Sequence, residues 1–129
     1  MNLQEFAIIV AGGKGTRMKS AVPKQFMPIN GLPVLMHTLN AFFQYSNDIQ
    51  IILVLPADDL VTWKKLCDQY NYEKPIVLAT GGDSRFQSVK NGLASIKEKE
   101  GLVAIHDGVR PLASKDIIGA SYRLAAVHG

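Results

Sequence analysis

IIVAGGKGTRMKSAVPK, residues 8–24, joins a short apolar run to a loop of glycines and basic residues. Residues 6–10 are apolar and rich in β-branched side chains, which is typical of a strand buried on both faces of a sheet. The run ends at Gly12 and Gly13, where glycine lets main-chain N–H groups approach a ligand closely and adopt positive φ. The sequence therefore predicts a buried strand that leads directly into an anion-binding loop.

Basic residues are concentrated in this loop. Among the first 25 residues the basic side chains are Lys14, Arg17, Lys19 and Lys24, and the only acid is Glu5. This segment therefore carries a charge of +3, which equals the formal net charge of the whole chain. Such a concentration indicates a local site for a polyanion such as phosphate, and not a generally basic surface.

Two common phosphate-binding loops do not match the glycine pattern. G-x-x-x-x-G-K-[ST] needs a second glycine where Arg17 or Met18 stands. G-x-G-x-x-G needs a third glycine, which allows a helix to pack closely against a strand, but Met18 stands at that position. The structural alternative is a glycine turn with solvated lysines. The pattern that remains, A-G-G-x-G-T-R-M followed by P-K-Q, resembles the signature loop of nucleotidyltransferases that join a nucleoside triphosphate to a sugar or polyol phosphate.

Composition indicates one ordinary globular domain. The 129 residues are 47% hydrophobic and 19% charged, and a chain of this length buries about two-thirds of its unfolded surface. No apolar run reaches the ~20 residues of a membrane helix. The start lacks the regions of a signal peptide, and Cys67 alone cannot form an internal disulfide. We therefore expect a cytoplasmic protein with no membrane partner, and no nucleic-acid partner because no basic helix accompanies the loop.

Apolar runs alternate with helical spacing along the chain. The runs cover residues 6–10, 50–55, 75–79 and 102–105, and the helical patterns cover 33–45, 58–70, 84–99 and 114–127, with Pro33 suited to the first helical position. Continuously apolar strands are typical of βαβ units and a parallel sheet. We therefore expect an α/β fold, with an open, mainly parallel sheet and helices on both faces.

Polar clusters follow three of the predicted strands at their carboxyl ends, where ligands bind in open α/β sheets. They cover residues 12–24, 81–85 (GGDSR) and 106–111 (HDGVRP). In the second cluster, glycines and a helix start would present N–H groups to a ligand, with Ser84 as a cap and Arg85 and Ser88 within reach. The apolar residues of that helix, which we expect to face inward, are Phe86, Val89, Leu93 and Ile96.

Asp107 follows the fourth run by one or two residues. A carboxylate there is suited to hold a hard divalent cation such as Mg²⁺ against phosphate oxygens, which complete the coordination shell. Alternatively, Asp107 caps the turn or pairs with Arg110. We interpret His106 as an orienting or packing residue, because an ionised phosphate nucleophile has no proton to lose.

The segments AGGKGTRM, PKQF, GGDSRFQSV and HDGVRP closely resemble the 2-C-methyl-D-erythritol 4-phosphate cytidylyltransferases of the non-mevalonate isoprenoid pathway, in the same order. The resemblance implies a Rossmann-like fold of the nucleotide-diphospho-sugar transferase type, a divalent metal, CTP and a polyol phosphate as substrates, and a homodimer. It also implies that residues 1–129 are the N-terminal, CTP-binding part of one longer nucleotidyltransferase domain, whose later residues complete the substrate site and the dimer.

The resemblance also implies roles for residues that match by position. The residues that would wrap CTP are Ala11, Gly12, Gly13, Gly15 and Thr16. Arg17 and Lys24 would be catalytic, holding the phosphates and offsetting charge. Those that would hold the cytosine end are Gly82, Asp83 and Ser88. Arg110 would lie toward methylerythritol phosphate, and Asp107 would bind Mg²⁺.

Two other functions stay open. Ribitol 5-phosphate cytidylyltransferases share the AGGxGxRM and PKQ elements, although Ser88 and Val89 after Arg85 favour the erythritol enzyme. A non-catalytic nucleotide-binding or dinucleotide-dependent module is the other alternative. Against that module, Pro56 follows the second strand where a dinucleotide fold places an acidic residue.

Overall fold

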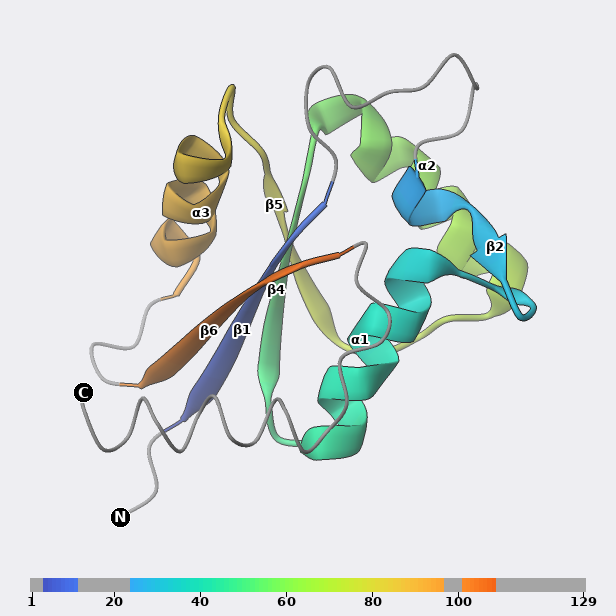
Figure 1. Ribbon diagram of the computed structural model, residues 1–129, viewed down its shortest axis with the longest axis horizontal. Coiled ribbons are helices and arrows are strands. Elements are labelled where there is room, and N and C mark those ends of the chain that lie inside the picture. The colour runs from blue at the N-terminus through green and yellow to red at the C-terminus, as the bar shows by residue number, and fades with distance from the viewer. Residues whose placement is uncertain (1–3, 12–23, 97–100, 109–129) are drawn as a thin grey trace.

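The computed structural model describes residues 4–11, 24–96 and 101–108 (Figure 1). Its elements, in chain order, are β1 (Glu5–Val10), η1 (Lys24–Phe26), β2 (Pro28–Ile29), β3 (Leu32–Pro33), α1 (Val34–Tyr45), β4 (Gln50–Leu55), α2 (Ala57–Tyr70), β5 (Ile76–Thr80), α3 (Arg85–Ala94) and β6 (Leu102–Asp107). The helix expected over residues 114–127 lies outside the described residues. No helix in the described ranges combines the length and apolarity needed to cross a membrane.

The main sheet confirms the predicted parallel α/β fold. Its strands run in the order β5-β4-β1-β6, and every neighbouring pair in it is parallel. The predicted runs match the ends of the observed strands to within one residue, except that β6 continues through His106 and Asp107. Asp107 is therefore the last residue of the strand and not a residue beyond it, because it pairs in register with Val10.

Helices cover both faces of this sheet, as expected (Figure 1). Side chains of β1 alternate between two apolar clusters. Ala7 and Ile9 pack with residues of α1 and α2, whereas Phe6, Ile8 and Val10 lie on the α3 side. Full burial of each large apolar side chain contributes roughly 1.5–3 kcal/mol. This double burial explains why β1 is a continuous apolar run.

The segment before α1 forms a small hairpin that the sequence analysis did not predict. Strands β2 and β3 pair antiparallel across Asn30 and Gly31, which have φ values of 51° and 85°. An Asn-Gly pair with positive φ is the preferred two-residue hairpin turn. The Val34 N–H donates to the Met27 carbonyl at 2.9 Å, which holds Pro33 extended as the N-cap of α1. The prediction that Pro33 is the first helical residue is therefore wrong.

Helix α3 faces the sheet with only part of the side that was predicted. Its exposed residues include Phe86 and Leu93, at 77% and 45%, whereas Ser88 and Gly92 are buried. A Cβ at Gly92 would lie 2.9 Å from Ile8 Cγ2, so this glycine permits close approach of helix and strand. Val89 and Ile96 pack against the sheet as expected. The helix ends at Ala94, before the predicted end at residue 99.

Candidate functional site

Three of the predicted polar clusters begin at the same edge of the sheet. Backbone hydrogen bonds extend the sheet by one residue past β1, β5 and β6. The donors are the N–H groups of Ala11 (to Val54 O, 3.1 Å), Gly81 (to Leu55 O, 2.8 Å) and Gly108 (to Val10 O, 2.9 Å). The three clusters, distant in sequence, therefore start side by side at the carboxyl edge, where ligands bind in such sheets.

The turn between β5 and α3 is held by polar side chains of the helix. Ser84 caps α3 as predicted, because its Oγ accepts a hydrogen bond from the Gln87 N–H at 3.1 Å. The Gly82 N–H donates to Ser88 Oγ at 3.0 Å, and Ser88 is buried. Asn91 Nδ2 donates to the Thr80 carbonyl at 2.9 Å. The Gly82 N–H is thus hydrogen-bonded within the protein, and the Ser88 side chain stabilises the turn.

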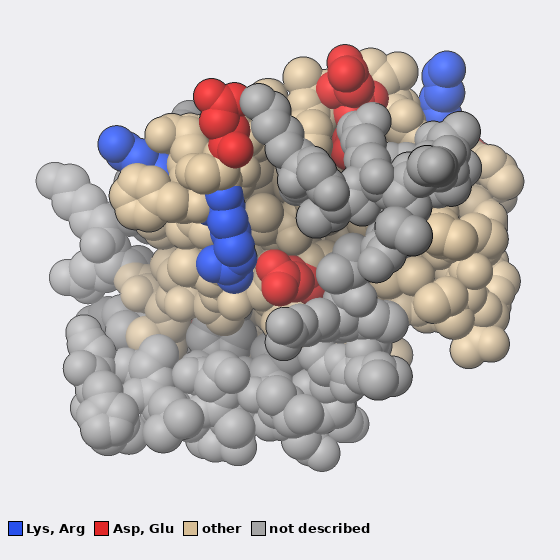
Figure 2. Space-filling model, turned by 45° about the horizontal axis from the view of Figure 1, so that its top comes forward, with Lys and Arg blue, Asp and Glu red and all other residues tan. Residues whose placement is uncertain are grey.

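Asp107 lies beside a basic side chain of α3. The Arg85 Nε and Asp107 Oδ1 atoms are 3.5 Å apart, and the two side chains are 60% and 36% exposed. Figure 2 turns this edge forward and shows acidic and basic side chains near one another on it. An ion pair this open to solvent contributes at most about 1 kcal/mol. Arg85 therefore balances the Asp107 charge without closing the carboxylate to a ligand.

The residue after Asp107 is fixed by α1. Thr38 Oγ1, fully buried, donates to the Gly108 carbonyl at 2.9 Å. A Cβ at Gly108 would lie 2.8 Å from Ala11 Cβ, so the residues that directly follow β1 and β6 are packed closely against each other. His106 packs edge-on against Phe42, with ring centroids 5.4 Å apart, in agreement with the packing role predicted for it.

The PKQF segment is anchored to α2 by two contacts that the sequence analysis missed. Gln25 Nε2 donates to Asp59 Oδ2 at 3.1 Å, and both side chains are buried. The Phe26 ring stacks with the Trp63 ring at a centroid distance of 6.5 Å. Buried polar side chains need hydrogen-bond partners. The sequence signal for this hydrogen bond was Asp59, an acid in the first turn of a helix that carries core residues.

The predicted site residues divide into two groups. Those that lie at or next to the carboxyl edge in the described ranges are Ala11, Gly82, Asp83, Ser88 and Asp107, and Lys24 begins η1. Those outside the described residues are Gly12, Gly13, Gly15, Thr16, Arg17 and Arg110. The proposed pairing of Asp107 with Arg110 is likewise outside them.

Comparisons with known proteins identify the family. The family model for IspD, 2-C-methyl-D-erythritol 4-phosphate cytidylyltransferase, matches residues 6–128. A relative of that name from Bacteroides thetaiotaomicron is 51% identical over 126 residues, which are 98% of this chain and 57% of the relative. One from Porphyromonas gingivalis is 46% identical over 129 residues, 100% of this chain and 57% of the relative.

A solved structure gives the same result for the fold. The crystal structure of 4-diphosphocytidyl-2C-methyl-D-erythritol synthase from Anaerococcus prevotii superposes with a TM-score of 0.74 at 29% identity, covering 98% of this chain and 52% of that one. The chain thus spans a little over half the length of the relatives it matches. On the match over residues 6–128, the chain belongs to the 2-C-methyl-D-erythritol 4-phosphate cytidylyltransferase (IspD) family.

Proposed function

We propose that this chain serves the reaction for which its relatives are named, the transfer of a cytidylyl group from CTP to 2-C-methyl-D-erythritol 4-phosphate. The products are 4-diphosphocytidyl-2-C-methyl-D-erythritol and pyrophosphate. The observation that supports the proposal is that three of the family's motif segments start from one sheet edge, where the N–H groups of Ala11, Gly81 and Gly108 donate hydrogen bonds to neighbouring strands. As the resemblance implies, we expect a cytoplasmic homodimer.

The reaction needs alignment and charge stabilisation more than proton transfer. An oxygen of the 4-phosphate attacks the α-phosphorus of CTP, a new P–O bond forms, and the bond to the bridging oxygen breaks as pyrophosphate leaves with its electron pair. Arg17 and Lys24 are the proposed groups that offset the charge developing on the α-phosphate. Gln25 and Phe26, anchored on α2, hold the main chain directly after Lys24 in place.

The turn after β5 is proposed to hold the cytosine end of CTP. Ser88 Oγ accepts the Gly82 N–H, and its own hydroxyl hydrogen meets no acceptor among the described residues. That hydrogen is available to a carbonyl or ring nitrogen of a pyrimidine. Asp83 follows in the same turn and would read the donor side of the base. A ligand at this turn would also lie close to the start of α3, where the helix dipole favours the negative phosphates.

Asp107 fits the divalent cation that the family implies. Magnesium is usually held by one or two carboxylates, together with phosphate oxygens and water. Asp107 supplies one such oxygen ligand, partly open to solvent at the end of β6. The described residues contain no group of three or more His, Cys, Asp or Glu side chains placed to hold a metal ion. When bound, Mg²⁺ would offset the charge of the triphosphate. Arg85 and Asp107 of this chain would determine the position of the triphosphate at the sheet edge.

The test is pyrophosphate release with CTP and each candidate acceptor. We would assay the 129-residue chain and a chimera extended by the C-terminal segment of the Bacteroides thetaiotaomicron relative. The expected result is Mg²⁺-dependent release with methylerythritol phosphate in at least one form, and little with ribitol 5-phosphate. Faster release with ribitol 5-phosphate, or tight CTP binding without release by either form, would replace the proposal with one of the two alternatives.

A further inference from the structure

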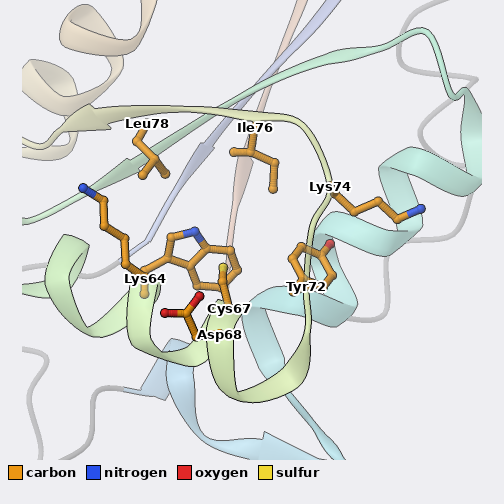
Figure 3. Close-up of a pocket in the computed structure, with 8 residues that line it drawn as sticks. Lys64, Cys67, Asp68, Tyr72, Lys74, Ile76 and Leu78 are labelled. Carbon is orange, nitrogen blue, oxygen red and sulfur yellow. The ribbon is translucent and has the colours of Figure 1, made fainter.

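A pocket of ≈ 380 Å³ lies between α2 and β5, on the face of the sheet that α1 and α2 cover (Figure 3). Its lining residues come from α2, from the connection to β5 and from β5 itself: Trp63, Lys64, Cys67, Asp68, Tyr72, Lys74, Ile76 and Leu78. Those residues are not the ones that form the carboxyl edge. We propose that this pocket is a second binding site, which takes a small aromatic carboxylate.

Trp63 gives the pocket a fixed hydrogen-bond donor. Its side chain is 3% exposed and makes no hydrogen bond with any described residue. No fully buried side-chain nitrogen or oxygen in the described ranges lacks a partner, so the indole N–H of Trp63, a lining residue of the pocket, is not fully buried. Buried indole N–H groups normally find an acceptor. The ring is held by Phe26 at 6.5 Å and Tyr72 at 5.9 Å between centroids.

Lys64 supplies a positive charge at the rim. Figure 3 shows its side chain rising from α2 toward the Leu78 end of the pocket, while the Lys74 side chain extends away. The Lys74 ammonium lies 5.4 Å from the Phe43 ring centroid, so a cation–π contact accounts for its direction. Lys64 has no ion pair within the described part of the chain. An anionic acceptor bound to the indole N–H would therefore gain a second partner in Lys64.

The charged lining residues, Lys64, Asp68 and Lys74, are exposed, and the rest of the lining suits an apolar body. Burial, with a smaller effect of the Asp68 charge, raises the pKa of the Cys67 thiol, so the thiol is protonated near neutral pH. Tyr72 donates its hydroxyl hydrogen to Asn40 Oδ1 at 2.9 Å and presents its ring to the pocket. Ile76 and Leu78 complete the apolar side. A flat ring fits these walls, whereas a triphosphate would bring several charges to one lysine and Asp68.

The first experiment uses 2-naphthoate as the probe and 2-naphthylmethylammonium as the matched control of opposite charge. Because the chain has one tryptophan, its ¹H–¹⁵N spectrum has one indole N–H signal, which reports directly on Trp63. We expect 2-naphthoate to move this signal downfield with a Kd of about 1 mM or lower, the value for a ligand of this size at ordinary efficiency. The cation should bind at least about tenfold more weakly. Equal binding of the two probes, or no shift with 2-naphthoate, would overturn the proposal.

Variants then separate this site from adsorption elsewhere. Trp63→Phe keeps an aromatic ring without the donor, and Lys64→Ala removes the rim charge. Each should weaken 2-naphthoate binding about tenfold in calorimetry. Lys65→Ala removes the neighbouring exposed lysine of α2, which does not line the pocket, and should leave the affinity unchanged. Lys64→Ala is a surface change that leaves the core intact. If its affinity for 2-naphthoate equals that of Lys65→Ala, the pocket is not the binding site.

Discussion

Replacing Gln25 tests whether the anchor beside Lys24 matters for stability and for catalysis. Gln25→Met keeps the approximate length and volume of the side chain but removes the hydrogen bond to Asp59, a residue that is 4% exposed. A hydrogen bond to a charged group contributes about 1.5–3 kcal/mol. We therefore expect the free energy of unfolding to fall by about 2–3 kcal/mol.

The assay is urea unfolding of Gln25→Met, of Asp59→Asn and of the double variant. The m value should be the same for all three, so that a shift of the midpoint reports a change in the free energy of unfolding. Because the two residues touch, their effects should not add, and the coupling energy should be about 1–2 kcal/mol. Asp58→Asn is the matched control, since Asp58 is an exposed acid in the same first turn and should contribute only the ~0.3–1 kcal/mol of a helix-dipole charge.

The same variants connect the anchor to the proposed reaction. If Gln25 places the main chain that carries Lys24, Gln25→Met should lower kcat roughly ten- to hundredfold, because small misplacements of a catalytic group are costly. Asp58→Asn should not change kcat. A stability loss for Gln25→Met no larger than that of Asp58→Asn would refute the energetic reasoning. Normal kcat despite lost stability would limit the anchor to folding.

Four further predictions concern other residues. Asp107→Asn should keep the fold but lower Mg²⁺-dependent CTP turnover about a hundredfold, ~3 kcal/mol of barrier; unchanged turnover at saturating metal would contradict the metal assignment. Arg17→Ala and Lys24→Ala should each lower kcat more than they raise KM for CTP in steady-state kinetics, and changes confined to KM would indicate ground-state binding only. Gly92→Ala should destabilise the chain by roughly 1–2 kcal/mol in urea unfolding, because its Cβ would meet Ile8 Cγ2 at 2.9 Å and overpacking outweighs the gain in helix propensity; a more stable variant would show that α3 can shift. Burial, with a smaller effect of Cys67, raises the pKa of Tyr72 above its ordinary value of 10.0. The free energy of unfolding should therefore fall as pH rises above about 10, less steeply in Tyr72→Phe, and equal slopes would refute this.

The sheet could be predicted from sequence because its strands are apolar on both faces. Residues 6–10 and 51–55 are continuous apolar runs, and such runs are typical of a parallel sheet covered on both faces. The side of α3 that faces the sheet could not be predicted from hydrophobic spacing. Phe86 and Leu93 suggested one face, but close approach to Ile8 requires small residues, and Ser88 and Gly92 supply them on another.

The candidate site could be predicted only where a motif carried the information. GGDSR and HDGVRP located the turn after β5 and the end of β6, and the fold brings both to one edge. The contacts that hold Gly108 and Gln25 were not predictable, because each joins residues far apart in sequence. Thr38 and Gly108 are 70 positions apart, and Gln25 and Asp59 are 34 apart. A single polar residue in an apolar helix pattern does not identify its partner.

The central position of β1 affects how the chain folds during synthesis. β1 is synthesised before β4 and β6, yet it pairs with both, and Glu5 is in register with Leu102. At roughly 5–20 residues per second, translation of the intervening ~100 residues takes about 5–20 s. Until β6 has been synthesised, the apolar side chains of Phe6, Ile8 and Ile9 are only partly buried. The nascent chain should therefore depend on chaperones that shield apolar N-terminal segments, and slower translation before β6 should lengthen that dependence.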